Sequence, residues 1–350
     1  MIKLGTRLAL AAALALIPAT MAGPASMASP QAPGAAPVAW VVNQSVRSAT
    51  KGSVTPIDTA TNTVIRKIPV SRNAIAVALA PGGGTAWVAL NADRLGGRGR
   101  VIPVSTSMYH VGKPVKVGIL PQTMAITPNG KTLYVGDWDS GFVTPIRTAT
   151  GTAGRRIATG PIPGAVAMAI TPDGKTLYVV NQAPGTVTPI DIAANTAGRN
   201  IKVGQTPSSI VITPDGKTLY AVGNTTVTPI STATNTAGTT IHVAPRLGTD
   251  STVAITPDGR TVYVGGLSLR NTGNFVVPVS TATGAVGKAI VVRGDPYSMA
   301  VAPGGKTLYV LCDGNPGSAP QDVVPVSTAT NTAGRAIDTG LQPVAIAISR

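Results

Sequence analysis

The chain has 350 residues and carries 28 Lys and Arg against 13 acidic residues, which gives a formal net charge of +15 at pH 7. Every acid is aspartate, and the chain has only two histidines and one cysteine, Cys312, which excludes an internal disulfide. Few side chains are available for acid–base, thiol or transition-metal chemistry, so we expect no catalytic residue, no metal site and no cofactor.

The first 28 residues have the pattern of a secretory signal peptide. Two cations precede the apolar run 8–17, which is too short to span a bilayer, and small residues follow it. We expect cleavage after Ala22 or Ala28, and a short linker rich in Pro and Ala over residues 29–37. No later run of 18 apolar residues exists, so the mature chain is predicted to be secreted or associated with the cell envelope, without a transmembrane segment.

Residues 38–350 contain an internal repeat. A hairpin pattern of the type Thr-Pro-Asp-Gly-Lys-Thr-Leu-Tyr-Val recurs every 42 to 47 residues, with its proline at positions 81, 128, 172, 214, 257 and 303. A second motif, Val-x-Pro-Ile/Val, occurs seven times, starting at Val54, Val101, Val143, Val187, Val227, Val276 and Val323. Because the first motif has one copy fewer than the second, the missing hairpin must fall across the two ends of the chain.

Each repeat is predicted to form four short strands, here called A to D in chain order. In one repeat these are residues 165–171, 175–181, 186–191 and 197–204. Four strands in this period are typical of a propeller blade, so we predict an all-β, seven-bladed β-propeller of four-stranded antiparallel blades in a single domain, 38–350. A solenoid would need capping repeats, which the sequence lacks. We expect the C-terminal strand 344–349 to be strand A of the blade whose strands B to D lie within 38–70, which closes the ring and removes free sheet edges.

The repeat resembles a known family. The pattern Pro-Asp-Gly-Lys-Thr-Leu-Tyr-Val-x-Asn, followed by Thr-Val-x-x-Ile-Asp-x-x-Thr-Asn-Thr, is similar to that of the YVTN-repeat β-propellers of bacteria and archaea, and it recurs in register over nearly all of 38–350. The resemblance implies an exported or surface-associated propeller, in a family whose activities are mostly unassigned. Lactonases and the heavy subunits of amine dehydrogenases have similar blades, but nothing here matches their catalytic residues.

Two repeated positions lead to structural predictions. One position of strand B carries Trp or Tyr in every repeat, which indicates packing rather than ligand binding: Trp40, Trp87, Tyr134, Tyr178, Tyr220, Tyr263 and Tyr309. The middle of strand C always carries proline, which removes a ladder donor: Pro56, Pro103, Pro145, Pro189, Pro229, Pro278 and Pro325. We therefore expect a bulge or an unpaired position opposite each of these prolines.

Function is expected on one face of the ring. The A–B and C–D turns share one face and are uniform, whereas the B–C and D–A loops share the other face and vary, as binding loops on a rigid scaffold do. Seven aspartates are predicted to lie in these variable loops: Asp93, Asp137, Asp139, Asp250, Asp295, Asp313 and Asp322. The candidate ligand-binding residues are Arg94, Arg98, Arg100, Asp137, Trp138, Asp139, Asp295, Tyr297 and Asp313. The alternative is that these loops carry only the ordinary charge of a solvated surface.

Three functions remain open from the sequence. The first is a binding scaffold that contacts an envelope protein or polysaccharide through the variable face, as a monomer. In this interpretation Trp138 stacks on a sugar or cation, although it could equally plug its loop against a neighbour. The second is a lactonase-like hydrolase acting at the channel mouth. The third is electrostatic binding of an anionic envelope polymer or nucleic acid by a basic rim of Lys and Arg on the hairpins and outer strands; no aromatic stripe accompanies this rim, so no specific nucleic acid is expected.

Overall fold

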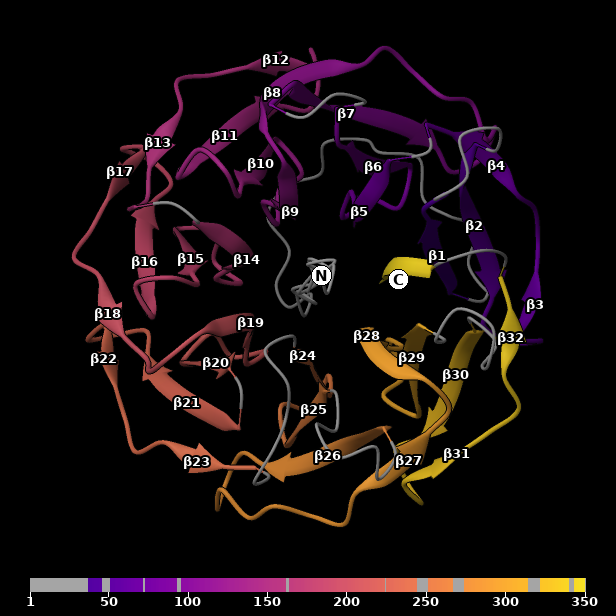
Figure 1. Ribbon diagram of the computed structural model, residues 1–350, viewed down its shortest axis with the longest axis vertical. Helices are drawn as coiled ribbons and strands as arrows, with labels where there is room; N and C mark the ends of the chain where they lie inside the picture. Colours follow the sequence, from indigo (N-terminus) through magenta and orange to yellow (C-terminus); the bar gives the residue numbers. More distant parts are fainter. Residues whose placement is uncertain are drawn as a thin grey trace, which may run out of the picture.

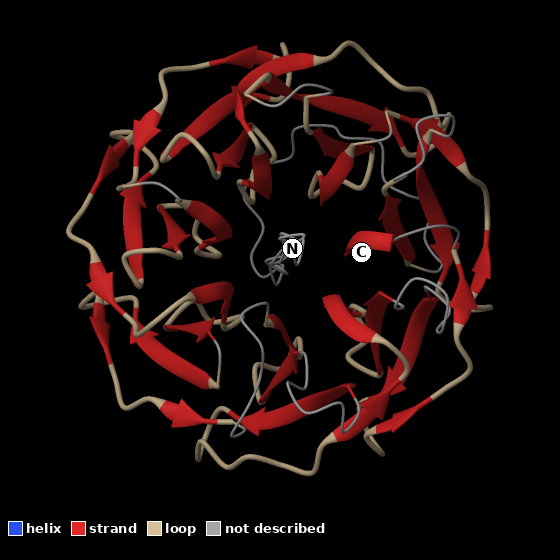
Figure 2. Cartoon of the chain, in the orientation of Figure 1, coloured by secondary structure: helices blue, strands red, loops and turns tan. Residues whose placement is uncertain are grey.

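The computed structural model shows seven blades around a central axis (Figure 1). Within the described residues every regular element is a β-strand (Figure 2), and none is a helix long and apolar enough to cross a bilayer. The predicted signal peptide and most of the predicted linker lie outside these residues. The structure describes residues 37–45, 51–71, 73–92, 96–161, 164–223, 225–243, 251–266, 274–313, 322–339 and 343–349.

Each blade is an antiparallel sheet whose strands follow the order A, B, C, D from the axis outward. Blades 1 to 7 are taken in that order below. The innermost A strands are β33 (Pro343–Ile348), β5 (Ala74–Leu79), β9 (Pro121–Ile126), β14 (Ala165–Ile170), β19 (Pro207–Ile212), β24 (Thr252–Ile255) and β28 (Asp295–Val301). The B strands are β1 (Val38–Asn43), β6 (Thr85–Leu90), β10 (Thr132–Asp137), β15 (Thr176–Asn181), β20 (Thr218–Gly223), β25 (Thr261–Gly266) and β29 (Thr307–Asp313).

The outer half of each blade consists of strand C and a strand D that is often split in two. The C strands are β2 (Gly52–Asp58), β7 (Arg98–Ser105), β11 (Phe142–Arg147), β16 (Thr186–Asp191), β21 (Thr226–Ser231), β26 (Asn274–Ser280) and β30 (Asp322–Ser327). The D strands are β3 (Thr63–Val64) with β4 (Ile68–Val70), β8 (Val115–Ile119), β12 (Thr152–Ala153) with β13 (Ile157–Ala158), β17 (Thr196–Ala197) with β18 (Ile201–Lys202), β22 (Thr236–Ala237) with β23 (Ile241–His242), β27 (Ile290–Val292), and β31 (Thr332–Ala333) with β32 (Ile337–Asp338).

The two ends of the chain complete one blade, as predicted. Strand β33 pairs antiparallel with β1, and Trp40 lies opposite Ala347. The Ser349 backbone N–H donates to the Val38 carbonyl at 2.8 Å, and the Val38 N–H donates to Ser349 Oγ at 2.9 Å. Figure 1 shows this last strand, in yellow, beside the first strand, in indigo. The ring is therefore closed by a blade that neither end of the chain could form alone.

The core consists of layers between neighbouring blades. Alternating Val, Ile and Ala side chains of strands A, B and C face the next blade, where they are removed from water. The seven Trp and Tyr side chains of strand B are at most 6% exposed, which confirms their predicted packing role. Four of the tyrosine hydroxyls reach an asparagine in the C–D turn of the next blade, in the pairs Tyr134–Asn195, Tyr178–Asn235, Tyr263–Asn331 and Tyr309–Asn62.

The strand C prolines lie where strand D bulges, as predicted. In blade 3, Ile146 pairs with Ala153 and Val143 pairs with Ile157, so one extra residue of strand D faces the stretch that contains Pro145. The Pro145 carbonyl accepts a hydrogen bond of 2.7 Å from the Gly154 N–H. Because the N and O atoms of one strand residue point to the same side, the proline nitrogen also faces this bulge, where no ladder bond is lost.

Candidate functional site

One face of the ring repeats the same hydrogen bonds from blade to blade. In blade 4, Thr171 Oγ1 donates to Asp173 Oδ1 at 2.6 Å, and the same oxygen accepts from the Lys175 N–H at 3.0 Å. Equivalent pairs link Thr127 with Asn129, Thr213 with Asp215 and Thr256 with Asp258. These A–B hairpins are therefore structural on the face that we call the constant face.

The opposite face, which we call the variable face, differs among the blades. The last buried position of strand B lies at this face, and it carries asparagine in two blades, glycine in two, and leucine, aspartate and cysteine in one each: Asn43, Leu90, Asp137, Asn181, Gly223, Gly266 and Cys312. A position that packs identically in every blade would not need such different side chains. The chemical variation predicted for the loops thus extends into the ends of the strands.

Asp137 is buried rather than part of a solvated loop, which corrects the prediction from the sequence. It is the last residue of β10, and its side chain lies fully buried between blades 2 and 3. Thr144 Oγ1 donates to Oδ2 at 2.9 Å, while Oδ1 has no partner among the described atoms. Burial raises the pKa of Asp137 to about 7, which outweighs the hydrogen bonds from Thr144 and the Gly118 backbone and the charges of Arg156 and Arg98. This carboxyl group cannot contact a ligand directly.

The counterparts of Asp137 explain why it is buried. In blade 4, Asn181 Nδ2 donates to Thr188 Oγ1 at 2.7 Å, and Thr188 Oγ1 donates to the carbonyl of Thr159 in the preceding blade at 3.0 Å. In blade 1, Asn43 Nδ2 donates to a threonine hydroxyl in the same way, at 2.9 Å. The position therefore suits a side chain that donates, and an aspartate donates only when it is protonated.

Trp138 follows Asp137 and packs inward. Its half-buried side chain contacts the hydrophobic cluster of blades 4 and 5 that contains Val166 and Val203. Its backbone is fixed on both sides, because its N–H donates to the Leu120 carbonyl at 3.0 Å and its carbonyl accepts from the Gly164 N–H at 2.9 Å. This geometry is that of a plug against the neighbouring blade. Asp139 is exposed in the turn that follows.

Four further candidate residues lie at strand ends on the variable face. Arg98 begins β7 and is exposed, whereas Arg100 is half-buried opposite Lys116. Asp295 was expected in a loop, but it begins β28, two positions before Tyr297. The other two candidates add little, because Arg94 lies outside the described residues and Asp313 is described only as the last residue of β29, another strand end. Asp93 and Asp250 also lie outside the described residues.

Tyr297 connects three blades. It belongs to strand A of blade 7, yet its half-buried side chain packs against two hydrophobic clusters. One contains Val344 of blade 1, and the other contains Ile75 of blade 2. The charge of Arg98 of blade 2 also acts on Asp137 of blade 3. The candidate residues thus belong to blades 7, 2 and 3, of which blades 7 and 2 lie on either side of blade 1 and blade 3 lies next to blade 2 in the ring.

Blade 7 holds an acidic strand end. Asp322 begins β30, again a strand rather than the predicted loop, and lies directly opposite Asp338 of β32. Burial and the charge of Asp338 raise the pKa of Asp322, while Arg293 lowers it. Burial also raises the pKa of Cys312 to about 12, followed by the charges of nearby aspartates, so its thiol stays protonated at neutral pH. This environment is unfavourable for a thiolate nucleophile.

The two histidines and the described acids are spread over the ring. The two histidines, His110 and His242, are exposed on a C–D turn and an outer strand, away from the channel. Within the described ranges, no group of three or more His, Cys or Asp residues is arranged to hold a metal ion.

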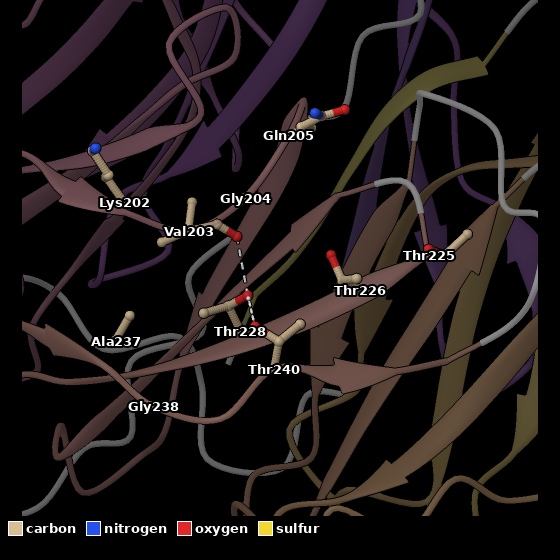
Figure 3. Close-up of a pocket in the computed structure, with 10 residues that line it drawn as sticks. All are labelled: Lys202, Val203, Gly204, Gln205, Thr225, Thr226, Thr228, Ala237, Gly238 and Thr240. Atoms are coloured by element: carbon tan, nitrogen blue, oxygen red, sulfur yellow. Dashed lines mark hydrogen bonds between the residues drawn. The ribbon is translucent and has the colours of Figure 1, made fainter.

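A pocket of about 500 Å³ opens at the rim between blades 4 and 5 (Figure 3), and the sequence analysis did not identify it. Its wall is rich in hydroxyl groups. It is lined by Lys202, Val203, Gly204, Gln205, Thr225, Thr226, Thr228, Ala237, Gly238 and Thr240. At its base Thr228 Oγ1 donates to the Val203 carbonyl at 3.1 Å and lies 3.2 Å from Thr240 Oγ1, as the dashed lines in Figure 3 show.

Comparison with known proteins leaves the family open. No protein-family model matches the chain, and no curated protein matches it either. The similarity to YVTN-repeat propellers therefore rests on the repeat motifs described above.

Solved structures share the fold. A putative 6-phosphogluconolactonase from Bacteroides fragilis is 16% identical with a TM-score of 0.72, and the match covers 92% of this chain and 100% of that one. A protein of unknown function from Desulfotomaculum acetoxidans is 16% identical with a TM-score of 0.72, over 89% of this chain and 99% of that one. Kuenenia stuttgartiensis hydrazine synthase is 23% identical with a TM-score of 0.67, over 78% of this chain and 88% of that one. At such identities the likeness shows the seven-bladed propeller fold and nothing about activity.

Proposed function

We propose that the chain is an exported, non-enzymatic binding scaffold that contacts an envelope protein or polysaccharide through the variable face of blades 7, 1, 2 and 3. The observation that carries the proposal is the contrast between the two faces. The hairpins of the constant face repeat the same hydrogen bonds, whereas the strand ends at the variable face carry five different residue types across the seven blades. Variable positions on a rigid, repeated frame are typical of a recognition surface.

The exposed candidates that could touch a partner are few. Arg98 and Asp139 are exposed on neighbouring blades, and Tyr297 is half-buried where blades 7, 1 and 2 meet. Asp137 and Trp138 support this surface from below, because the first is buried and the second packs inward. Charges of both signs beside an aromatic ring suit a polar partner.

The test compares two matched single changes on opposite faces. Arg98→Ala and Lys217→Ala each remove one exposed cation, the first from the variable face and the second from a constant-face hairpin. The immobilised protein is incubated with a detergent extract of the native envelope, and each retained species is quantified by mass spectrometry. We expect Arg98→Ala to lower retention of the main species at least fivefold and Lys217→Ala to leave it unchanged. Equal loss in both variants, or in neither, contradicts the proposal.

Hydrolysis of a lactone is the second candidate, because two Bacteroides neighbours of the same fold are named putative 6-phosphogluconolactonases. Against it, the buried Asp137 has no exposed surface and the histidines lie outside the channel. The rate of 6-phosphogluconolactone hydrolysis with the purified chain, compared with the spontaneous rate, tests whether the chain is a lactonase. We expect no acceleration above the uncatalysed rate.

A further inference from the structure

The outer strands carry their positive charge on one side of the ring. In blades 1 to 4, the outer segments that contain strand D hold eight cations and no acid: Arg66, Lys67, Lys113, Lys116, Arg155, Arg156, Arg199 and Lys202. All eight side chains are exposed. In blades 5 to 7 the described parts of the corresponding segments hold three cations, Lys288, Arg293 and Arg335, together with one acid, Asp338. We call the eight residues of blades 1 to 4 the basic arc.

The strands that carry the basic arc follow one another along the circumference. Figure 1 shows β4, β8, β13 and β18 in succession on the outer edge, followed by β23 of blade 5. Two of the cations are held by aromatic rings, since the Arg66 guanidinium lies 5.3 Å from the ring centre of Tyr109 and that of Arg156 lies 4.8 Å from Phe142. The basic arc therefore spans four consecutive blades, and two of its cations are held in place.

The threonine-lined pocket lies at the end of this arc. Lys202, the last cation of the basic arc, is also part of the pocket wall. Four threonines and Gln205 supply the other polar side chains, from two neighbouring blades. A polyanion that followed the arc would thus reach a concave site able to form hydrogen bonds with hydroxyl groups, of a size usual for ligand pockets.

Two residues of the pocket wall stand at positions where blade 3 carries large side chains. In blade 3, Phe142 faces Ala158 across the ladder and is covered by Arg156. The counterpart of Phe142 in blade 5 is Thr226, which faces His242, and the counterpart of Arg156 is Thr240. Two large side chains are thereby replaced by two small hydroxyl-bearing ones, which leaves space between the blades.

We propose that the basic arc and the pocket between blades 4 and 5 form a second binding site, on the rim, for an anionic polysaccharide or polyol polymer that carries phosphate or carboxylate groups. The arc supplies a salt-dependent attraction along the polymer backbone. The pocket holds one polyol or sugar unit by hydrogen bonds to Thr225, Thr226, Thr240 and Gln205. Its lining contains no aromatic side chain, so it has no platform on which nucleic acid bases could stack.

The experiment uses fluorescence anisotropy with four labelled probes at several salt concentrations: poly(glycerol phosphate), oligogalacturonate, neutral dextran and single-stranded oligothymidylate. Thr226→Phe fills the pocket with the residue that blades 3 and 6 already accept, and Thr240→Asp places a negative charge at an exposed pocket position. Arg199→Ala combined with Lys202→Ala shortens the arc. Lys288→Ala combined with Arg335→Ala is the matched control, because it removes two exposed cations from blades 6 and 7.

We expect at least one anionic glycan probe to bind, and the tighter of the two to identify phosphate or carboxylate as the recognised group. Thr226→Phe and Thr240→Asp should each weaken that binding about tenfold, while the arc double variant should weaken it and reduce the salt slope by about 2, one for each lost cation. The control should bind like the unchanged chain. The proposal is overturned if neither glycan binds, if dextran or oligothymidylate binds as tightly, if both pocket variants bind normally, or if the control loses as much as the arc variant.

Discussion

The Tyr309 hydroxyl of blade 7 donates a hydrogen bond of 2.7 Å to Asn62 Oδ1 of blade 1, across the joint where the ring closes. Asn62 has a φ of 55°, a left-handed conformation that Asn adopts more readily than most residues. The same pairing recurs between other neighbouring blades. The closing joint therefore uses the same contact as the joints between blades 4 and 5 and between blades 6 and 7.

Loss of this contact should weaken the fold. Tyr309→Phe removes the hydroxyl and leaves Asn62 Oδ1 without this donor, so we expect a loss of about 1 kcal/mol in the free energy of unfolding. Tyr220→Phe is the matched control, because its counterpart acceptor in the next blade is Gly284, which has no side chain. Urea unfolding of both variants measures the difference. If the two changes cost the same, the hydrogen bond does not contribute to closure.

The fold should lose stability in alkali. Burial, with the charge of a nearby aspartate, raises the pKa of both Tyr178 and Tyr309 to about 12, from an ordinary value of 10. Both tyrosines are neutral in either state below pH 10, but between pH 10 and 12 the unfolded chain releases their protons first. The free energy of unfolding should therefore fall as the pH rises through this window. Thermal melts at pH 9, 10 and 11 check this fall, and Tyr309→Phe should make it shallower.

Asp137 should make the free energy of unfolding fall as the pH rises from 4 to 7. Its pKa is raised to about 7, so the folded state favours the neutral acid, and the unfolded chain ionises first as the pH rises from 4. Stability contributed by the neutral form is complete below pH 4 and is lost as the pH rises to 7. Asp137→Asn should remove this loss and stabilise the protein at pH 8 by about 1 to 3 kcal/mol, since an amide can donate to Thr144.

The converse change tests the same reasoning at the equivalent site. Asn181→Asp should lower the melting temperature more at pH 8 than at pH 5, because a buried carboxylate replaces a donor to Thr188. A melting temperature of Asp137→Asn that follows the same pH profile as the unchanged chain would show that Asp137 does not titrate as inferred.

A glycine that lies against a strand C proline should not tolerate a larger side chain. A Cβ atom on Gly112 would lie 2.8 Å from Pro103 Cγ, whereas one on Gly304 would meet nothing within 4 Å. We expect Gly112→Ala to destabilise by about 1 kcal/mol and Gly304→Ala to be neutral or slightly stabilising. Differential scanning calorimetry compares the two. Similar melting temperatures would mean that the bulge accommodates a larger residue beside the proline ring.

The fold is predictable from the sequence because each structural position recurs in several blades and can be compared among them. The register of β33 against β1, the buried strand B aromatics and the bulge at each proline all follow from positions that recur blade after blade. The functional residues are the positions where the blades differ, and there a repeat says little. The repeat places Asp137 at the border between strand B and a variable loop, and only its Asn counterparts at 43 and 181 mark this border as a buried polar position.

The pocket was missed for a related reason. Thr226 is a half-buried residue of β21 and Thr240 is an exposed residue between β22 and β23, and only their alignment with Phe142 and Arg156 shows that both positions carry smaller side chains here. The packing of Arg156 on Phe142 is visible only in the folded ring. A comparison of side-chain volume at equivalent positions of the seven blades could have located the pocket.

If the variable face recognises the partner, that face should be protected from hydrogen–deuterium exchange in the complex. The purified chain is measured alone and with the envelope species that it retains. We predict slower exchange in segments 96–100, 138–141 and 295–298, with the constant-face hairpins 128–131, 172–175 and 214–217 unchanged. Protection confined to those hairpins, or spread only over the outer strands, would mean that the variable face does not bind the partner.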